Sequence, residues 1–165
     1  MVDLAILGYQ FPEMTDVPWD SDWLLLRLRL QWGEHHWEHI DPALTTFELE
    51  RLALWLLEVA QHADVFGRWT QERLSTLCTF TEPNLAFKAY SGHPTGHPVT
   101  LRIYLTAELL PPFRTLLPTG PLSDDSEVWV EFGVDAARLR TLAQQLQRDL
   151  ERFPVRVGLN LPSQP

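Results

Sequence analysis

The sequence predicts an α+β fold, in which a mostly antiparallel sheet packs one of its faces against two amphipathic helices. Three observations predict this class: apolar residues alternate along several short segments, two separate segments repeat apolar residues at helical spacing, and each helical segment follows a capping residue. The chain has 165 residues, of which 45% are hydrophobic, so it can bury the core of one domain. We therefore expect a single globular domain over residues 1–158 and a tail over residues 159–165.

The alternation is clearest between Asp22 and Trp32. Five apolar side chains there would point toward a core, while Arg27 and Arg29 would point the other way. A proline- and glycine-containing acidic loop is expected over residues 111–126. Shorter strands are expected over residues 4–10, 36–40, 74–80, 85–90, 99–105 and 128–134.

The first helix is expected over residues 46–62. Thr45 at its N-cap and Glu48 three positions later form the sequence pattern of a capping box, and Leu44 can pack against Leu49 across that turn. One helical face then collects the apolar residues Leu49, Leu52, Ala53, Leu56, Val59 and Ala60.

The second helix is expected to begin after Asp135, which can cap it, and to end before Pro154. Its apolar stripe consists of Leu139, Leu142, Ala143, Leu146 and Leu150. Two such helices, each with one apolar stripe, would cover the same face of the sheet.

The net charge of −9 is concentrated in the body of the chain. Residues 1–134 hold 8 basic and 19 acidic residues, whereas residues 135–165 hold 5 basic and 3 acidic residues. Such a charge would repel nucleic acid and anionic membranes and would favour a basic partner, although a solubilising surface is the alternative explanation. Two clusters stand out: Glu13, Asp16, Asp20 and Asp22 in one, and Asp124, Asp125, Glu127 and Glu131 in the other.

The lengths of the apolar runs and the number of cysteines indicate the cellular compartment in which the protein is expected. No apolar run approaches the roughly 20 residues that a membrane span needs, and no basic region precedes the short apolar run Leu4–Leu7, as it would in a signal peptide. The single cysteine, Cys78, excludes an intrachain disulfide and is expected in the core. We expect a cytoplasmic protein.

The segment Glu34–His39 is the nearest approach to a metal-binding motif. On a strand, His35 and His39 would share a face with Trp37, while His36 would lie on the opposite face, so the three imidazoles would not converge on one zinc ion.

His93 and His97 supply two ligands at most. The sequence also lacks a GxSxG elbow and a glycine-rich phosphate loop. We therefore predict no catalytic residue, metal site or cofactor, although an active site assembled from distant residues stays open.

The outward side of the predicted sheet is the best candidate for a binding surface, because exposed aromatic residues among charges are typical of such surfaces. A second layer or a dimer partner could instead cover it. If the alternation holds, this side displays Arg27, Arg29, Arg102, Tyr104, Trp129 and Glu131.

Three segments resemble the WapI-like immunity family over roughly residues 5–135. They are Trp23-Leu24, the segment Asp41-Pro-Ala-Leu-Thr-Thr-Phe-Glu-Leu-Glu-Arg-Leu-Ala-Leu-Trp-Leu56, and Phe80-Thr-Glu-Pro-Asn-Leu-Ala-Phe87. The resemblance implies a protein that accompanies a bacterial polymorphic toxin and neutralises it by binding, with no cofactor and no catalysis. It transfers no toxin-contacting residue to this sequence.

The resulting hypothesis is a toxin-binding immunity protein. Its partner would be a cognate toxin domain, of which a basic nuclease is one fitting example, and neither nucleic acid nor membrane is an expected partner. A homodimer, a metal-dependent enzyme of unrecognised class and a structural domain stay open. The candidate contact residues are Asp124, Asp125, Glu127, Trp129, Glu131, Arg102 and Tyr104.

Overall fold

A computed structural model describes residues 1–120 and 127–157 of the chain. It contains seven strands in two antiparallel sheets together with two long helices, which confirms the α+β class and the antiparallel pairing. The strands do not form the single sheet that the alternation suggested, because they divide into one sheet of three strands and one of four. We call these sheet A and sheet B.

Sheet A has the order β1-β2-β3, with β1 over Val2–Tyr9, β2 over Trp23–Trp32 and β3 over His35–Thr45. Gly33 adopts a positive φ of 58° in the tight turn between β2 and β3, a conformation that glycine takes without strain. The central strand β2 alternates as predicted. Its inward leucines Leu24, Leu26, Leu28 and Leu30 are all buried.

Sheet B has the order β4-β5-β6-β7, with bounds Ser75–Thr79, Leu85–Ser91, Val99–Leu105 and Val128–Val134. The division into two sheets corrects one expectation about the outward surface. Arg27 and Arg29 belong to β2 of sheet A, where Arg29 lies opposite Glu38 and pairs with it. They therefore do not share a sheet face with Arg102, which lies on β6 of sheet B.

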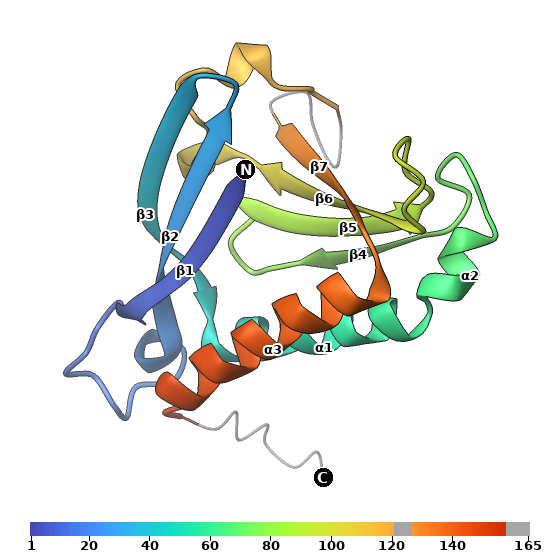
Figure 1. Cartoon of the computed structure of the whole chain (residues 1–165). Coiled ribbons are helices and arrows are strands. Elements are labelled where there is room, and N and C mark those ends of the chain that lie inside the picture. Colours follow the sequence, from blue (N-terminus) through green and yellow to red (C-terminus); the bar gives the residue numbers. More distant parts are fainter. Residues whose placement is uncertain (121–126, 158–165) are drawn as a thin grey trace, which may run out of the picture.

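The helices are α1 over Thr46–Gln61, α2 over Ala63–Gly67 and α3 over Ala136–Arg152. Figure 1 shows α1 and α3 side by side below the two sheets. The predicted capping box of α1 is present, since the Glu48 amide donates to Thr45 Oγ1 and the Thr45 amide donates to the Glu48 carboxylate at 3.0 Å. Within the described residues, three short 3-10 helices lie in the connections: η1 over Asp20–Asp22, η2 over Ala107–Leu109 and η3 over Arg114–Leu116.

One hydrophobic core joins both sheets to α1 and α3. Cys78 is part of it, as predicted, and burial raises the pKa of its thiol. No helix in residues 1–120 or 127–157 is long and apolar enough to cross a membrane. Fully buried core side chains include Leu24 and Leu44 from sheet A, Leu85 and Leu105 from sheet B, and Leu49 and Leu139 from the helices.

A side-chain hydrogen bond joins β3 to the residue before β5. The Asn84 side-chain nitrogen donates to the Asp41 carboxylate at 2.9 Å, and the backbone carbonyl of Asn84 accepts from the Thr106 amide at 3.0 Å. Asn84 is buried, and these bonds satisfy its side-chain nitrogen and its backbone carbonyl, while its side-chain oxygen Oδ1 has no partner among the described residues. Two sequence segments far apart in the chain are thereby held together, one beginning at Asp41 and the other containing Glu82-Pro-Asn-Leu85.

The segment after α3 folds back against sheet A and η1. The Asp22 carboxylate accepts hydrogen bonds from the backbone amides of Arg156 and Val157 and from the Thr46 hydroxyl, at 2.8 to 3.1 Å. Asp22 is fully buried, so it is not a member of the exposed acidic cluster in which the sequence placed it. The contact fixes the C-terminal end of the described chain to the start of α1.

Candidate partner-binding surface

The outer face of sheet B carries a cluster of charged and aromatic side chains, which we call the Arg102 cluster: Lys88, Tyr90, Arg102, Tyr104, Trp129 and Glu131. Strand register places them together. Arg102 on β6 lies opposite Lys88 on β5 and Glu131 on β7, while Tyr104 lies opposite Trp129. Because alternate residues of a strand share a face, all six project from the same side of the sheet.

Arg102 is the centre of this cluster. Its Nε donates to Glu131 Oε1 at 2.7 Å, and its two terminal nitrogens donate to the hydroxyls of Tyr104 at 3.1 Å and Tyr90 at 3.3 Å. Its guanidinium carbon lies 4.1 Å from the ring centroid of Trp129, within cation–π range. Tyr90 also donates to Glu131. The arginine is therefore fixed by its neighbours without any partner protein.

Two groups in the cluster have shifted pKa values. Burial raises the pKa of Tyr90 to about 12, and its hydrogen bond to the Glu131 carboxylate acts in the same direction. Burial alone would lower the pKa of Arg102, but hydrogen bonds to Tyr104 and Glu131 outweigh it and raise that pKa. The tyrosine stays neutral and the arginine stays charged at physiological pH.

The predicted contact residues differ in exposure. Arg102, Tyr104, Trp129 and Glu131 are brought together, but Tyr104 is only 3% exposed and Glu127 is also buried. Trp129 is half-buried, and the side chains of Arg102 and Glu131 keep 16% and 22% of their exposure. Asp124 and Asp125 lie outside the described residues.

Sequence reasoning did not select Lys88 and Tyr90 as members of this surface. Lys88 forms an ion pair with Glu72, and Tyr90 bridges Arg102 and Glu131. A signal for both existed, because they occupy the alternate, less apolar positions of the strand that was correctly predicted over residues 85–90. Only the register of β5 against β6 shows that they meet Arg102.

The histidines of β3 divide between the two faces of the strand as predicted. Trp37 and His39 stack with ring centroids 5.5 Å apart, and His35 stacks on Phe113 from the connection after β6. In residues 1–120 and 127–157, no three histidine, cysteine or carboxylate side chains are grouped as metal ligands would be.

The rings of His93 and His97 both contact the hydroxyl group of Thr95, which lies between them in the sequence. The Nδ1 atoms of the two rings lie 2.7 and 2.8 Å from Thr95 Oγ1. Both rings cover Gly133 on β7, where an added Cβ would come within 2.7 Å of His93 Nδ1 and 2.8 Å of His97 Nδ1. The loop thus closes over the end of β7, and Gly133 leaves the space for it.

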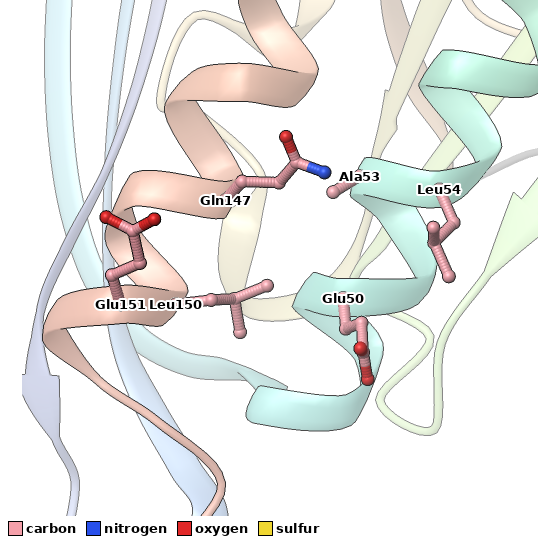
Figure 2. A pocket seen from close by; sticks show the side chains of 6 residues that line it. All are labelled: Glu50, Ala53, Leu54, Gln147, Leu150 and Glu151. Carbon is pink, nitrogen blue, oxygen red and sulfur yellow. The ribbon is translucent and has the colours of Figure 1, made fainter.

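A groove of about 410 Å³ lies between α1 and α3. Figure 2 shows that α1 contributes Glu50, Ala53 and Leu54, and that α3 contributes Gln147, Leu150 and Glu151. The carboxylates of Glu50 and Glu151 point away from one another, and the six lining residues include no histidine, cysteine or serine. The groove therefore does not assemble a nucleophile with a base.

The fold and the Arg102 cluster define a small, acidic α+β protein with a preformed surface of aromatic and charged groups, the composition that binding surfaces favour. The chain belongs to the immunity protein WapI-like family, whose model matches residues 1–154. Comparison with curated proteins and with solved structures found no match. The family match confirms the resemblance seen in the sequence and indicates the role of an immunity protein.

Proposed function

We propose that this immunity protein neutralises a cognate bacterial toxin domain by binding it, without catalysis and without a cofactor. The family membership over residues 1–154 is the observation that carries the proposal. An immunity protein can act by occupying the surface that a toxin needs for its own substrate. That mode of action requires a stable, complementary surface and no reacting group.

The outer face of sheet B is the proposed contact surface, centred on Trp129 with Arg102 and Glu131 beside it. Tryptophan and arginine are the residues that most often dominate binding energy at protein interfaces. Arg102 is already held by Glu131 and two tyrosines, so little side-chain entropy would be lost on binding. Tyr104 and Glu127 are buried and would support this surface from below rather than touch the toxin.

The charge of the chain favours a basic toxin domain. With a net charge of −9, the protein would attract a positively charged surface and accelerate encounter at low ionic strength. Asp124 and Asp125 lie a few positions before β7 in the sequence and contribute to this negative charge. A nuclease, which carries a basic groove for its own substrate, would be a suitable target.

Substitution of Trp129 tests the proposed surface. Trp129→Ala should weaken the complex with the cognate toxin domain by roughly 30-fold, the effect of removing an interface hot spot. Trp32→Ala is the matched control, since Trp32 is exposed at the far end of β2 in sheet A. Equal affinity of the Trp129 and Trp32 variants would reject sheet B as the contact surface.

The homodimer alternative makes a different prediction for the same variant. If a second copy of the chain covered the outer face of sheet B, Trp129→Ala would lower the molar mass of the free protein in solution. Light scattering on the purified chain and on the variant separates the two cases.

A further inference from the structure

We propose that the loop between β1 and η1, residues 10–19, together with Asp20 of η1, is a docking surface for a basic, arginine-bearing segment of a protein partner. Figure 1 shows this loop projecting at the lower left, beyond the end of β1. Its surface is distinct from the Arg102 cluster. Identifying the partner as the toxin rests on the proposed function, whereas the surface itself does not.

Large apolar side chains are exposed along this loop. Phe11, Val17 and Trp19 are all exposed, and Trp19 retains 50% of its accessible surface. Exposed apolar side chains gathered in one segment and rimmed by polar residues mark interaction sites more often than isolated ones do. A tryptophan among them is the side chain best suited to anchor a partner.

The exposed apolar residues alternate with three carboxylates, Glu13, Asp16 and Asp20. Within the described part of the chain, none of the three forms an ion pair with a cationic side chain. Their charge is therefore available to a partner, and it selects a cation over a phosphate or another carboxylate. The negative charge of the whole chain acts in the same direction.

Arginine fits this combination better than any other cationic group. Its planar guanidinium can stack on the faces of Trp19 or Phe11 while it donates hydrogen bonds to a neighbouring carboxylate. Lysine offers a point charge without the stacking plane. The surface thus favours an arginine-bearing protein segment, in keeping with a basic partner.

The C-terminal segment holds this loop in place. Arg156 donates to the backbone carbonyls of Phe11 at 3.0 Å and Met14 at 2.8 Å, and its guanidinium carbon lies 3.4 Å from the centroid of the Tyr9 ring. The Val17 amide donates to Ser21 Oγ at 3.0 Å. Anchoring from the body reduces the entropy that binding would remove from the loop.

The backbone at Trp19 has a φ of 70°, a left-handed conformation that non-glycine residues rarely adopt. Such strain persists only where the surrounding structure enforces it. Here the Asp22 amide donates to the Trp19 carbonyl, and the buried Asp22 side chain ties η1 to the segment after α3. The backbone that carries the exposed indole is consequently held in place.

The test uses the full chain and a synthetic peptide of alternating arginine and alanine, followed by NMR. Binding should shift the indole N–H of Trp19 and the backbone amides of the loop. A peptide with citrulline in place of arginine, which has the same shape and no charge, should bind at least roughly tenfold more weakly. Shifts that are absent from the loop, or equal with both peptides, would overturn the proposal.

Matched variants distinguish binding at this loop from attraction of the peptide to negative charge anywhere on the chain. Trp19→Ala should weaken the arginine peptide roughly three- to fivefold, while Trp69→Ala, at an exposed tryptophan after α2, should leave its affinity unchanged. Neutralising Glu13, Asp16 and Asp20 as amides should weaken binding more than neutralising the exposed helix residues Glu50, Glu58 and Glu151. An equal loss of affinity in the two tryptophan variants, or in the two triple amide variants, would show diffuse charge attraction and would refute the proposed surface.

Because the test contains no toxin, a negative result leaves the proposed toxin neutralisation through sheet B unaffected.

Discussion

Asp20 and Asp22 are neighbours of the same chemical type, yet the fold gives them opposite environments. Asp20 is exposed in η1, whereas Asp22 is fully buried and accepts three hydrogen bonds. The donors come from Thr46 and from the segment 156–157, which are distant in the sequence. Local sequence cannot distinguish the two aspartates, because only the tertiary structure brings those donors to Asp22.

Replacing Asp22 tests this difference at the residue scale. Asp22→Ala should reduce the free energy of unfolding by about 2–4 kcal/mol, because it leaves a buried hydroxyl and two partly buried backbone amides without an acceptor. Asp20→Ala should change it by less than about 0.5 kcal/mol. Urea denaturation of both variants measures the effect, and equal stabilities would show that Asp22 is not a structural anchor.

Tyr90 provides a pH-dependent test of the Arg102 cluster. Its pKa in the folded protein, about 12, lies above the ordinary value of 10, so the folded state favours the protonated phenol. The stability that this phenol contributes is therefore complete below pH 10 and is lost as the pH rises from 10 to about 12.

Alkaline titration followed by tyrosinate absorbance should show a phenol with a midpoint near 12 that disappears in Tyr90→Phe. The difference in unfolding free energy between the two proteins should narrow over the same pH range. A Tyr90 midpoint near 10 would contradict the partly buried hydrogen bond from Tyr90 to Glu131.

At the scale of elements, α1 was predictable because its signals are local. Thr45, Glu48 and the apolar stripe lie within a few turns of one another, and the predicted end differs from the observed one by a single residue. β3 was underestimated: it extends to Thr45, where its pairing with β2 continues past a register irregularity. The predicted strand covered only residues 36–40, because the residues after Ile40 do not alternate between apolar and polar. Only their pairing with β2 shows that they belong to the strand.

The inward stripe of α1 gives an element-scale prediction. Leu52→Ala should reduce the free energy of unfolding by about 2–5 kcal/mol, because Leu52 is fully buried and its removal leaves a cavity. Leu54, two positions along the same helix, is 58% exposed, and Leu54→Ala should change stability by less than about 0.5 kcal/mol. Thermal or urea unfolding compares them, and a near-zero effect at Leu52 would refute the packing of this stripe.

At the scale of the whole molecule, the fold class followed from the sequence but the number of sheets did not. Alternation shows that a strand has one buried face, yet it carries no information about which strands pair. For the same reason Arg102, Tyr104, Trp129 and Glu131 were correctly placed on one face, while Arg27 and Arg29 were wrongly added to it. Pairing is decided by contacts between segments distant in the sequence, such as β6 with β7.

Neutralisation by binding requires a direct complex between this chain and a toxin. Family membership indicates an immunity role, and the acidic chain with its fixed Arg102 cluster supports neutralisation by binding. Neither sheet B nor the loop before η1 needs a reacting group for that task. Catalysis would instead predict protection at far less than equimolar amounts.

The most direct measurement is a titration of the purified chain into its cognate toxin domain, with toxin activity and complex formation followed together. Toxin activity should fall to zero at an equimolar ratio, with a stable complex whose association slows as salt is added. Full toxin activity in the presence of excess chain, with no complex formed, would contradict neutralisation by binding.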